Sequence, residues 1–343
     1  MGACRPHGGG PGSGPGGETS KPGSSGHATC AGLAVRRGRG GATSGADDAP
    51  PWLGIACRRA RRVTGAVMRP LPDGRRIHFQ HGPIDLILEA WGPIAACRAA
   101  HDRAFARFAP LLEELVAELP QLRSAATTRC HGPVARRMTT AIAPHRPHFV
   151  TPMAAVAGAV ADEVLAALTG PGDLARAYVN NGGDIALFLS PGTRLDLALV
   201  AGGGLGADAG RIRIGAETAV RGVATSGWRG RSQSLGIADA VTVLARDAAQ
   251  ADVAATLIAN AVALPDHPAI THAPANSLDA DSDLGARPVT TGVGPLSPED
   301  IATALDAGLA EAARMRSHGL IIDATLFLQG ATRQLCQKGP RNA

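Results

Sequence analysis

The chain has 343 residues, 45% of them hydrophobic, and a formal net charge of +5. It contains no run of 18 or more uncharged apolar residues, so the sequence predicts no transmembrane helix and no membrane partner. The six cysteines are scattered without C-x-x-C spacing, which argues against a disulfide or metal framework and predicts a cytoplasmic location.

Residues 1–67 differ in composition from the rest of the chain. They contain 17 Gly and 6 Pro and carry a net charge of +6, whereas residues 68–343 carry −1. This segment has little periodic apolar sequence, so it cannot bury enough apolar surface to offset the conformational entropy lost on ordering, about 1–2 kcal/mol per residue. We therefore predict a disordered low-complexity tail. Because ordered sequence begins at Met68, we hypothesise that translation starts there. An Arg-rich tail can bind nucleic acid, but the charge of −1 and the few aromatic residues of the remainder argue against such a partner.

The first half of the remaining chain predicts a hairpin, two helices and a series of strands. Apolar residues alternate on both sides of His81-Gly82-Pro83, which predicts a β-hairpin over 75–90. Pro93 begins and Pro120 ends an amphipathic helix that we expect to lie on a sheet. A second helix is predicted over 151–168, with proline at its first position. The apolar runs that follow predict strands at 176–181, 184–189, 195–200, 211–216, 219–225 and 240–245.

The second half predicts two more helices and one last strand. The helices are expected at 248–263 and after the capping residue Ser297, and a loop is expected at 265–295. A strand at 320–328 ends the pattern. Strands come in runs with helices between the runs, which predicts an α+β fold with a largely antiparallel sheet and packed helices. The predicted organisation is a tail at 1–67, a single domain at 68–330 and a flexible C-terminal tail at 331–343.

Two glycine-centred polar segments are candidates for ligand binding. Asn180-Asn181-Gly182-Gly183-Asp184 joins two apolar strands, and Asn-Gly is typical of a tight hairpin turn. Alternatively, Asn181 and Asp184 hydrogen-bond a nucleotide while the glycines admit it. Thr225-Ser226-Gly227 ends a strand and is followed by Arg229, a combination of hydroxyls, free backbone and guanidinium that suits a pyrophosphate. The alternative for this segment is a loop with solvated arginines.

Asp252 and Thr256 are the candidate metal ligands. They lie four residues apart on a predicted helix and therefore share one of its faces. A carboxylate and a hydroxyl can supply oxygen ligands to Mg²⁺, which keeps several waters or phosphates and needs few protein ligands. The alternative interpretation is a surface acid beside an ordinary helix threonine.

Three stretches, taken in order, resemble the ApbE-like superfamily, whose best-known members are FAD:protein FMN transferases. They are Val-Asn-Asn-Gly-Gly-Asp-Ile at 179–185, Ala-Thr-Ser-Gly-Trp at 224–228, and the segment 241–256, which ends in Ala-Asp-Val-Ala-Ala-Thr. The chain is more similar still to a shorter branch of uncharacterised protein families (UPF). There the helix reads Thr-Pro-Met-Ala-Ala-Val-Ala-Gly, as at 151–158, and a Ser-x-Gly-x-Ala-Asp-Ala stretch precedes the core strand, as at 234–240.

The resemblance implies an ApbE-like fold that binds FAD, FMN or another nucleotide with Mg²⁺, and transferase-related phosphoester chemistry with an acceptor protein that the sequence does not identify. It implies that Asp252 and Thr256 hold the metal, and that residues of the two glycine-centred segments line the nucleotide pocket. The transferases carry His-x-x-Asp-Pro-x-Thr-Gly where this chain has the segment 234–240. The alternative is therefore a non-catalytic flavin-binding or accessory protein, for example in sulfur or homocysteine metabolism. The predicted nucleotide-binding residues are Asn181, Gly182, Gly183, Asp184, Thr225, Ser226, Gly227 and Arg229.

Overall fold

The computed structural model describes residues 65–127, 129–200, 208–230 and 232–335, and all of them fall in one compact unit. The tail predicted at 1–67 lies almost wholly outside the described residues, as does the last part of the predicted C-terminal tail. None of the described helices combines the length and the apolar character needed to cross a bilayer.

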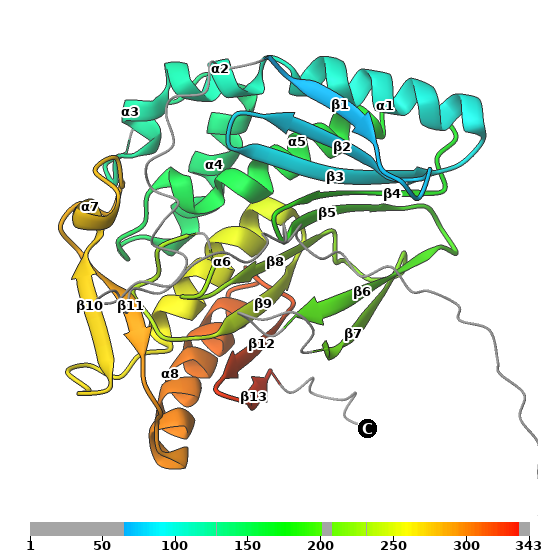
Figure 1. The fold of residues 1–343 in the computed structure, drawn as a ribbon. Helices are drawn as coiled ribbons and strands as arrows, with labels where there is room; N and C mark the ends of the chain where they lie inside the picture. Colours follow the sequence, from blue (N-terminus) through cyan, green and yellow to red (C-terminus); the bar gives the residue numbers. More distant parts are fainter. Residues whose placement is uncertain (1–64, 128, 201–207, 231, 336–343) are drawn as a thin grey trace, which may run out of the picture. The chain divides into compact units, whose positions relative to one another are not determined.

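A nine-stranded sheet is the centre of the fold, and every neighbouring pair in it is antiparallel (Figure 1). The α+β class and the antiparallel sheet expected from the sequence are therefore correct. In spatial order the strands are β1 (Val67–Pro70), β2 (Ile77–His81), β3 (Ile84–Trp91), β4 (Arg176–Asn181), β5 (Asp184–Leu189), β8 (Gly222–Ser226), β9 (Ala240–Ala245), β12 (Asp323–Leu328) and β13 (Ala331–Gln334).

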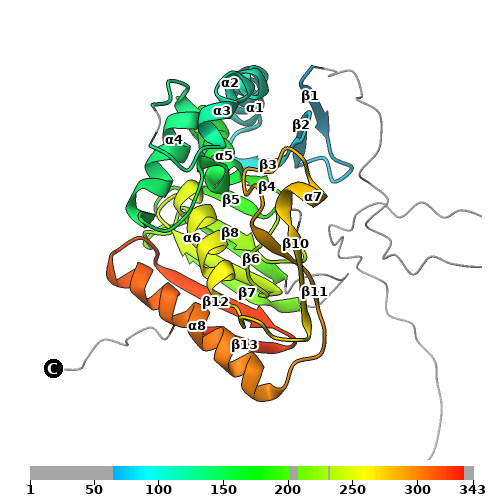
Figure 2. The ribbon, with the colours of Figure 1, turned by 90° about the vertical axis from the view of Figure 1, so that its left-hand side faces the viewer.

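Helices cover one face of this sheet (Figure 2). Helix α5 (Val156–Leu168) packs on β4 and β5, and α6 (Ala248–Ala261) packs on β8 and β9. Helix α1 (Ile94–Phe108) packs on α5 and also contacts β2 and β3, α4 (Pro133–Ile142) packs on α5, and α8 (Pro298–Ser317) packs on α6 and on β12 and β13. The opposite face of the sheet contacts the hairpin formed by β6 (Arg194–Val200) and β7 (Asp208–Gly215).

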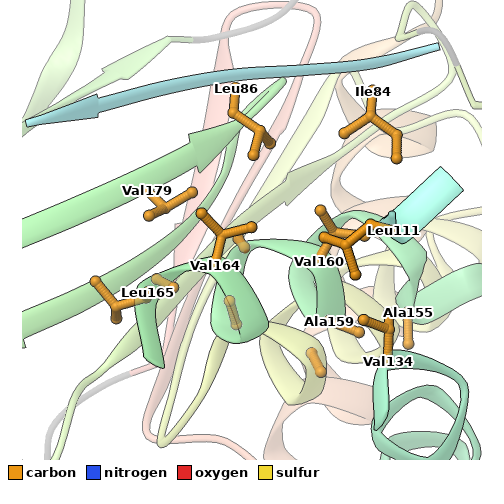
Figure 3. Packing of buried hydrophobic residues seen from close by; sticks show 14 of the residues in the cluster. Ile84, Leu86, Leu111, Val134, Ala155, Ala159, Val160, Val164, Leu165 and Val179 are labelled. Atoms are coloured by element: carbon orange, nitrogen blue, oxygen red, sulfur yellow. The ribbon is translucent and has the colours of Figure 1, made fainter. Parts of the chain in front are cut away.

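The apolar core beneath α5 follows from strand alternation. Leu86 of β3 and Val179 of β4 point to the helix side of the sheet, where they meet Val160 and Val164 of α5 (Figure 3). Successive residues of a strand point to opposite faces of the sheet. Leu187 of β5 points away from the helices and packs in the apolar cluster under the β6–β7 hairpin. Burial on both faces explains why β5 is apolar from Ile185 to Leu189.

Close approach of α5 to α6 depends on Gly158. A Cβ atom at this position would overlap the carbonyl oxygen of Ala248 at the start of α6. Because that obstacle is backbone, no side-chain rotation would relieve it. The small residue is therefore what lets the two helices touch, and α6 in turn carries both predicted metal ligands.

Several element boundaries differ from the sequence predictions. The helix expected from Pro93 to Pro120 is broken at Pro110, where α2 (Leu111–Ala117) begins, and α3 (Leu119–Leu122) follows. Proline lacks an N–H and cannot continue the hydrogen-bond ladder, so the change of direction has a local cause. The expected loop at 265–295 contains the hairpin β10 (Ile270–Pro274) and β11 (Pro288–Val293), with α7 (Ala275–Leu278) between them. The strand β13 lies in the segment for which we predicted a flexible tail, and α4 was not predicted.

Candidate functional site

A pocket of about 470 Å³ opens above the helix-covered face of the sheet, where the β4–β5 turn, the end of β8 and the helices α5 and α6 converge. Helices α2 and α3 form its other wall. Its size is within the usual range for a small-molecule site, roughly 300–1,000 Å³. Of the ten predicted site residues, eight line this pocket: Asn181, Gly182, Asp184, Thr225, Ser226, Gly227, Asp252 and Thr256.

The β4–β5 turn is both a tight turn and a pocket wall. Gly182 and Gly183 adopt φ angles of +69° and +119°, which residues with a Cβ rarely adopt. The Gly183 N–H donates to Asn180 Oδ1 at 2.9 Å, and the Asn181 side-chain amide donates to the Ala157 carbonyl of α5 at 3.1 Å. The hairpin interpretation of this segment and the pocket interpretation are thus compatible. Gly183 itself is not among the lining residues.

The end of β8 contributes mainly backbone atoms and the Ser226 hydroxyl to the wall of the pocket. Ala224 faces the α6 side of the sheet, so Ser226, two residues later, faces the same side and the pocket. The Thr225 hydroxyl instead lies 2.9 Å from the Thr242 hydroxyl on β9. A Cβ at Gly227 would overlap the Asp239 carbonyl oxygen, which explains glycine at the point where the strand leaves the sheet.

Arg229 is not among the residues that line the pocket, and its side chain contacts neighbouring residues of the protein instead. Its Nε donates to Asp239 Oδ1 at 2.9 Å, and its guanidinium stacks on the Trp228 ring at 4.4 Å from the centroid. Asp239 also accepts the backbone N–H of Gln329 at 2.6 Å. The arginine therefore helps hold the β8–β9 connection to the end of β12.

Asp252 is the most perturbed acid of the pocket. One of its oxygens, Oδ2, accepts the Gly158 N–H at 3.0 Å. Burial raises the pKa of Asp252 to about 7, and the nearby Asp162 carboxylate acts in the same direction, while backbone N–H groups of α5 oppose both effects. The side chain of Thr256 lies one helical turn further on and lines the same pocket. A carboxylate that resists ionisation when alone gains most from a bound cation.

A second chamber of about 320 Å³ continues from the pocket. It shares Arg123, Asp184, Asp252 and Thr256 with the first chamber. Its further carboxylates come from the segment after α7, which we had predicted to be a loop. They are Asp279, Asp281 and Asp283.

Sequence reasoning missed two groups of lining residues. Leu112, Leu115 and Leu119 form the apolar wall on α2 and α3, whereas the periodicity suggested a helix lying on a sheet. Periodicity shows that a helix has an apolar face but not what that face contacts. The second group, Arg123 and the acids of the second chamber, had no local signal, because each is a single charged residue in irregular sequence.

Among the residues that the structure describes, no group of three or more His, Cys, Asp or Glu side chains gathers as a metal cluster. Asp184, Asp252 and Thr256 line one pocket and carry side-chain oxygen atoms, the kind of ligand that Mg²⁺ prefers.

Together the fold and the pocket define an α+β protein with a pocket between an antiparallel sheet and its covering helices. The model of the family described as AbpE bacteria matches residues 68–334, so the chain belongs to this ApbE-like family.

Curated relatives match only part of the chain. A UPF0280 protein of Methanosphaerula palustris is 38% identical over 162 residues, which cover 44% of this chain and 63% of the relative. A UPF0280 protein of Methanothermobacter thermautotrophicus is 40% identical over 138 residues, covering 39% of this chain and 51% of the relative. The match thus spans less than two thirds of each relative.

Asp162 predicts a pH dependence of stability. Its carboxylate accepts the Ala248 and Ala249 N–H groups at 3.0 and 2.9 Å, yet burial raises its pKa from 3.8 to about 6. Between these values the folded protein binds more protons than the unfolded chain. The contribution of Asp162 is therefore fully present below about pH 4 and is lost as the pH rises through about 6.

We expect the free energy of unfolding to fall by about 1–3 kcal/mol over this window because of Asp162. Urea denaturation of the parent and of Asp162→Asn at several pH values measures the effect. The variant loses one of the two accepted hydrogen bonds at every pH, so only the difference in slope is diagnostic. Parallel pH profiles would contradict the prediction.

Proposed function

We propose that this protein binds a flavin or another phosphate-bearing nucleotide together with Mg²⁺ in the two-chambered pocket. The observation that carries the proposal is convergence: residues from three separate segments, 181–184, 225–227 and 252–256, line one cavity. Membership of the ApbE-like family supports a site of this kind.

The division of the first chamber into an apolar and a polar side suits such a ligand. Leu112, Leu115 and Val160 are among the apolar side chains of one side. Ser226, Ser232 and Thr256 stand among the polar groups of the other. A flavin or a nucleobase is a flat, largely apolar ring joined to phosphates, so the ring would lie on the helix wall and the phosphates near β8 and α6.

The charge balance of the pocket favours binding of a phosphate together with a cation. Asp184 and Asp252 line the first chamber, while its Arg123 has an Nη1 atom 3.6 Å from Asp281. When both acids are ionised they repel a phosphate, and a divalent ion between them and the phosphate turns repulsion into attraction.

The residues present fit Mg²⁺. Asp252 has a second oxygen besides the one that accepts the Gly158 N–H, and the Thr256 hydroxyl makes no hydrogen bond to another described residue. When bound, the ion would neutralise charge that develops on phosphate oxygens during phosphoester cleavage or transfer. Gly158 orients the Asp252 carboxylate, the α2–α3 wall excludes water, and Ser226 and Gly227 line the side of the chamber where the phosphates would lie.

A non-catalytic binding role is the second candidate, and the segment 234–240 favours it. Ser234 is buried, and its hydroxyl lies 3.2 Å from Asn260 Oδ1 and accepts the Gly236 N–H at 3.2 Å. A Cβ at Gly236 would overlap the Ala259 carbonyl oxygen. This segment therefore packs on the end of α6 and supplies no acid or base to the first chamber, whose described lining includes no histidine.

Isothermal titration of the full-length chain with FAD, FMN and ADP, each with Mg²⁺ and with EDTA, tests the proposal. We expect saturable binding of at least one of the three that weakens at least tenfold when Mg²⁺ is removed. Incubation of FAD with the protein and Mg²⁺, followed by chromatography, tests for chemistry with water as the acceptor: release of AMP and FMN indicates cleavage of the pyrophosphate bond, and intact FAD shows that the protein does not hydrolyse it. Absence of binding under both conditions would contradict the proposal.

A further inference from the structure

A separate cavity of about 420 Å³ lies between α4 and the start of α6. We call it the α4 pocket and define it by Pro133, Arg136, Arg137, His145, Asp247 and Gln250, which are part of its lining. It shares no lining residue with either chamber of the proposed nucleotide site.

Two buried side-chain nitrogen atoms of the α4 pocket lack hydrogen-bond partners among the described residues. Arg137 Nε is one, although its Nη2 atom lies 3.3 Å from Glu163. His145 is the other: the residue is 2% exposed, and its Nδ1 is buried without a partner. Most buried polar groups in proteins are hydrogen-bonded, so two such atoms in one cavity call for an explanation.

The remaining polar groups of the cavity favour an acceptor-rich ligand. Arg136 is exposed at the rim, and its guanidinium has no ion pair with a described acid. Asp247 is the one acid of the described lining. Its two oxygens already accept the Gln250 N–H and the Gln250 side-chain amide, at 2.8 and 2.6 Å, so it caps α6.

Arg136, Arg137 and His145 thus present N–H groups to one space, whose other described polar side chains are Thr140, Asp247 and Gln250. Burial and the nearby Arg314 lower the pKa of His145 to about 4, so its ring is neutral at pH 7 and offers one N–H without a charge of its own. A tetrahedral oxyanion has enough acceptor oxygens for all three residues, and guanidinium groups match its geometry.

We propose that the α4 pocket binds a phosphate group, either as free phosphate or as part of a small phosphomonoester, through Arg136, Arg137 and His145. The volume of the cavity exceeds that of a phosphate ion and leaves room for a small organic portion against Pro133 and Leu320. A buried water molecule is the competing explanation for the two unpartnered nitrogen atoms.

Titration of the full-length chain in EDTA, which removes any metal-dependent binding, tests the proposal. The probes are inorganic phosphate, glycerol 3-phosphate and, as a neutral control, glycerol. We expect saturable binding of at least one phosphate probe and none of glycerol. Tighter binding of glycerol 3-phosphate assigns the site to a phosphomonoester, and equal or tighter binding of inorganic phosphate assigns it to free phosphate.

The matched variants are Arg136→Gln and Arg98→Gln. Both arginines are exposed and make no ion pair with a described residue, so neither change threatens folding, but Arg98 lies on α1 and does not line the pocket. We expect Arg136→Gln to weaken phosphate binding at least tenfold and Arg98→Gln to change it less than twofold. The ring ¹⁵N resonances of His145, assigned with His145→Gln, should shift during the titration. No saturable binding, equal effects of the two arginine variants, or an unmoved His145 resonance would overturn the proposal.

Discussion

Asp252→Asn is expected to weaken Mg²⁺-dependent nucleotide binding roughly 100-fold, which corresponds to about 2.7 kcal/mol. In the proposed site the Asp252 carboxylate is the charged oxygen ligand on α6, and the neutral amide oxygen of asparagine would hold the cation, and through it the phosphates, less firmly. Because the Asn oxygen can still accept the Gly158 N–H, and because the Asp252 pKa is raised to about 7, folding should suffer little. Titration calorimetry of both proteins with the ligand that binds best measures the effect.

Asp102→Asn is the control for this variant. Asp102 is exposed on α1 and does not line the pocket, so its replacement removes the same charge far from the proposed metal. We expect its affinity for ligand to stay within twofold of the parent. If Asp252→Asn behaves like Asp102→Asn, the metal site lies elsewhere and the assignment of Asp252 is wrong.

Gly158→Ala is expected to lower the free energy of unfolding by about 2 kcal/mol and to weaken nucleotide binding about tenfold. Overpacking against a backbone carbonyl costs roughly 3 kcal/mol, which outweighs the gain of about 1 kcal/mol that alanine brings in a helix. The binding loss follows because the Gly158 N–H orients Asp252, and the added Cβ pushes α5 away from α6. Urea denaturation and calorimetry of the same preparation measure the two effects.

Gly172→Ala is the matched control, since a Cβ there makes only an ordinary contact, 3.7 Å from Arg103 Nη2. Its stability should stay within about 0.5 kcal/mol of the parent, as for most surface substitutions. A normal stability for Gly158→Ala would mean that the two helices separate at little cost. A normal affinity together with reduced stability would mean that Asp252 does not depend on Gly158 for its orientation.

Local sequence determined the strands and turns of the site. The predicted strands 176–181 and 184–189 agree with β4 and β5 because residues of high strand propensity, such as Tyr178, Val179 and Ile185, stand on either side of two glycines that take positive φ. The strand β9 also follows from local sequence, because its short run rich in β-branched residues predicted a strand at 240–245. The cap of α8 is equally local: Ser297 accepts the Asp300 N–H at 3.1 Å. Such features depend on interactions between residues a few positions apart.

Only the tertiary structure decided which of these segments meet. β5 pairs with β8 and α6 packs across β8 and β9, which brings Asp184 and Asp252 to one cavity although 68 positions separate them in the chain. No periodicity encodes that pairing, because it depends on the packing of whole faces. The contacts of the apolar face of α2 and α3, the fold of 265–295 and the contact of Arg229 with Asp239 were not predicted for the same reason. Periodicity and turn chemistry act over a few residues, whereas the partner of each apolar face is chosen by the assembled sheet and its helices.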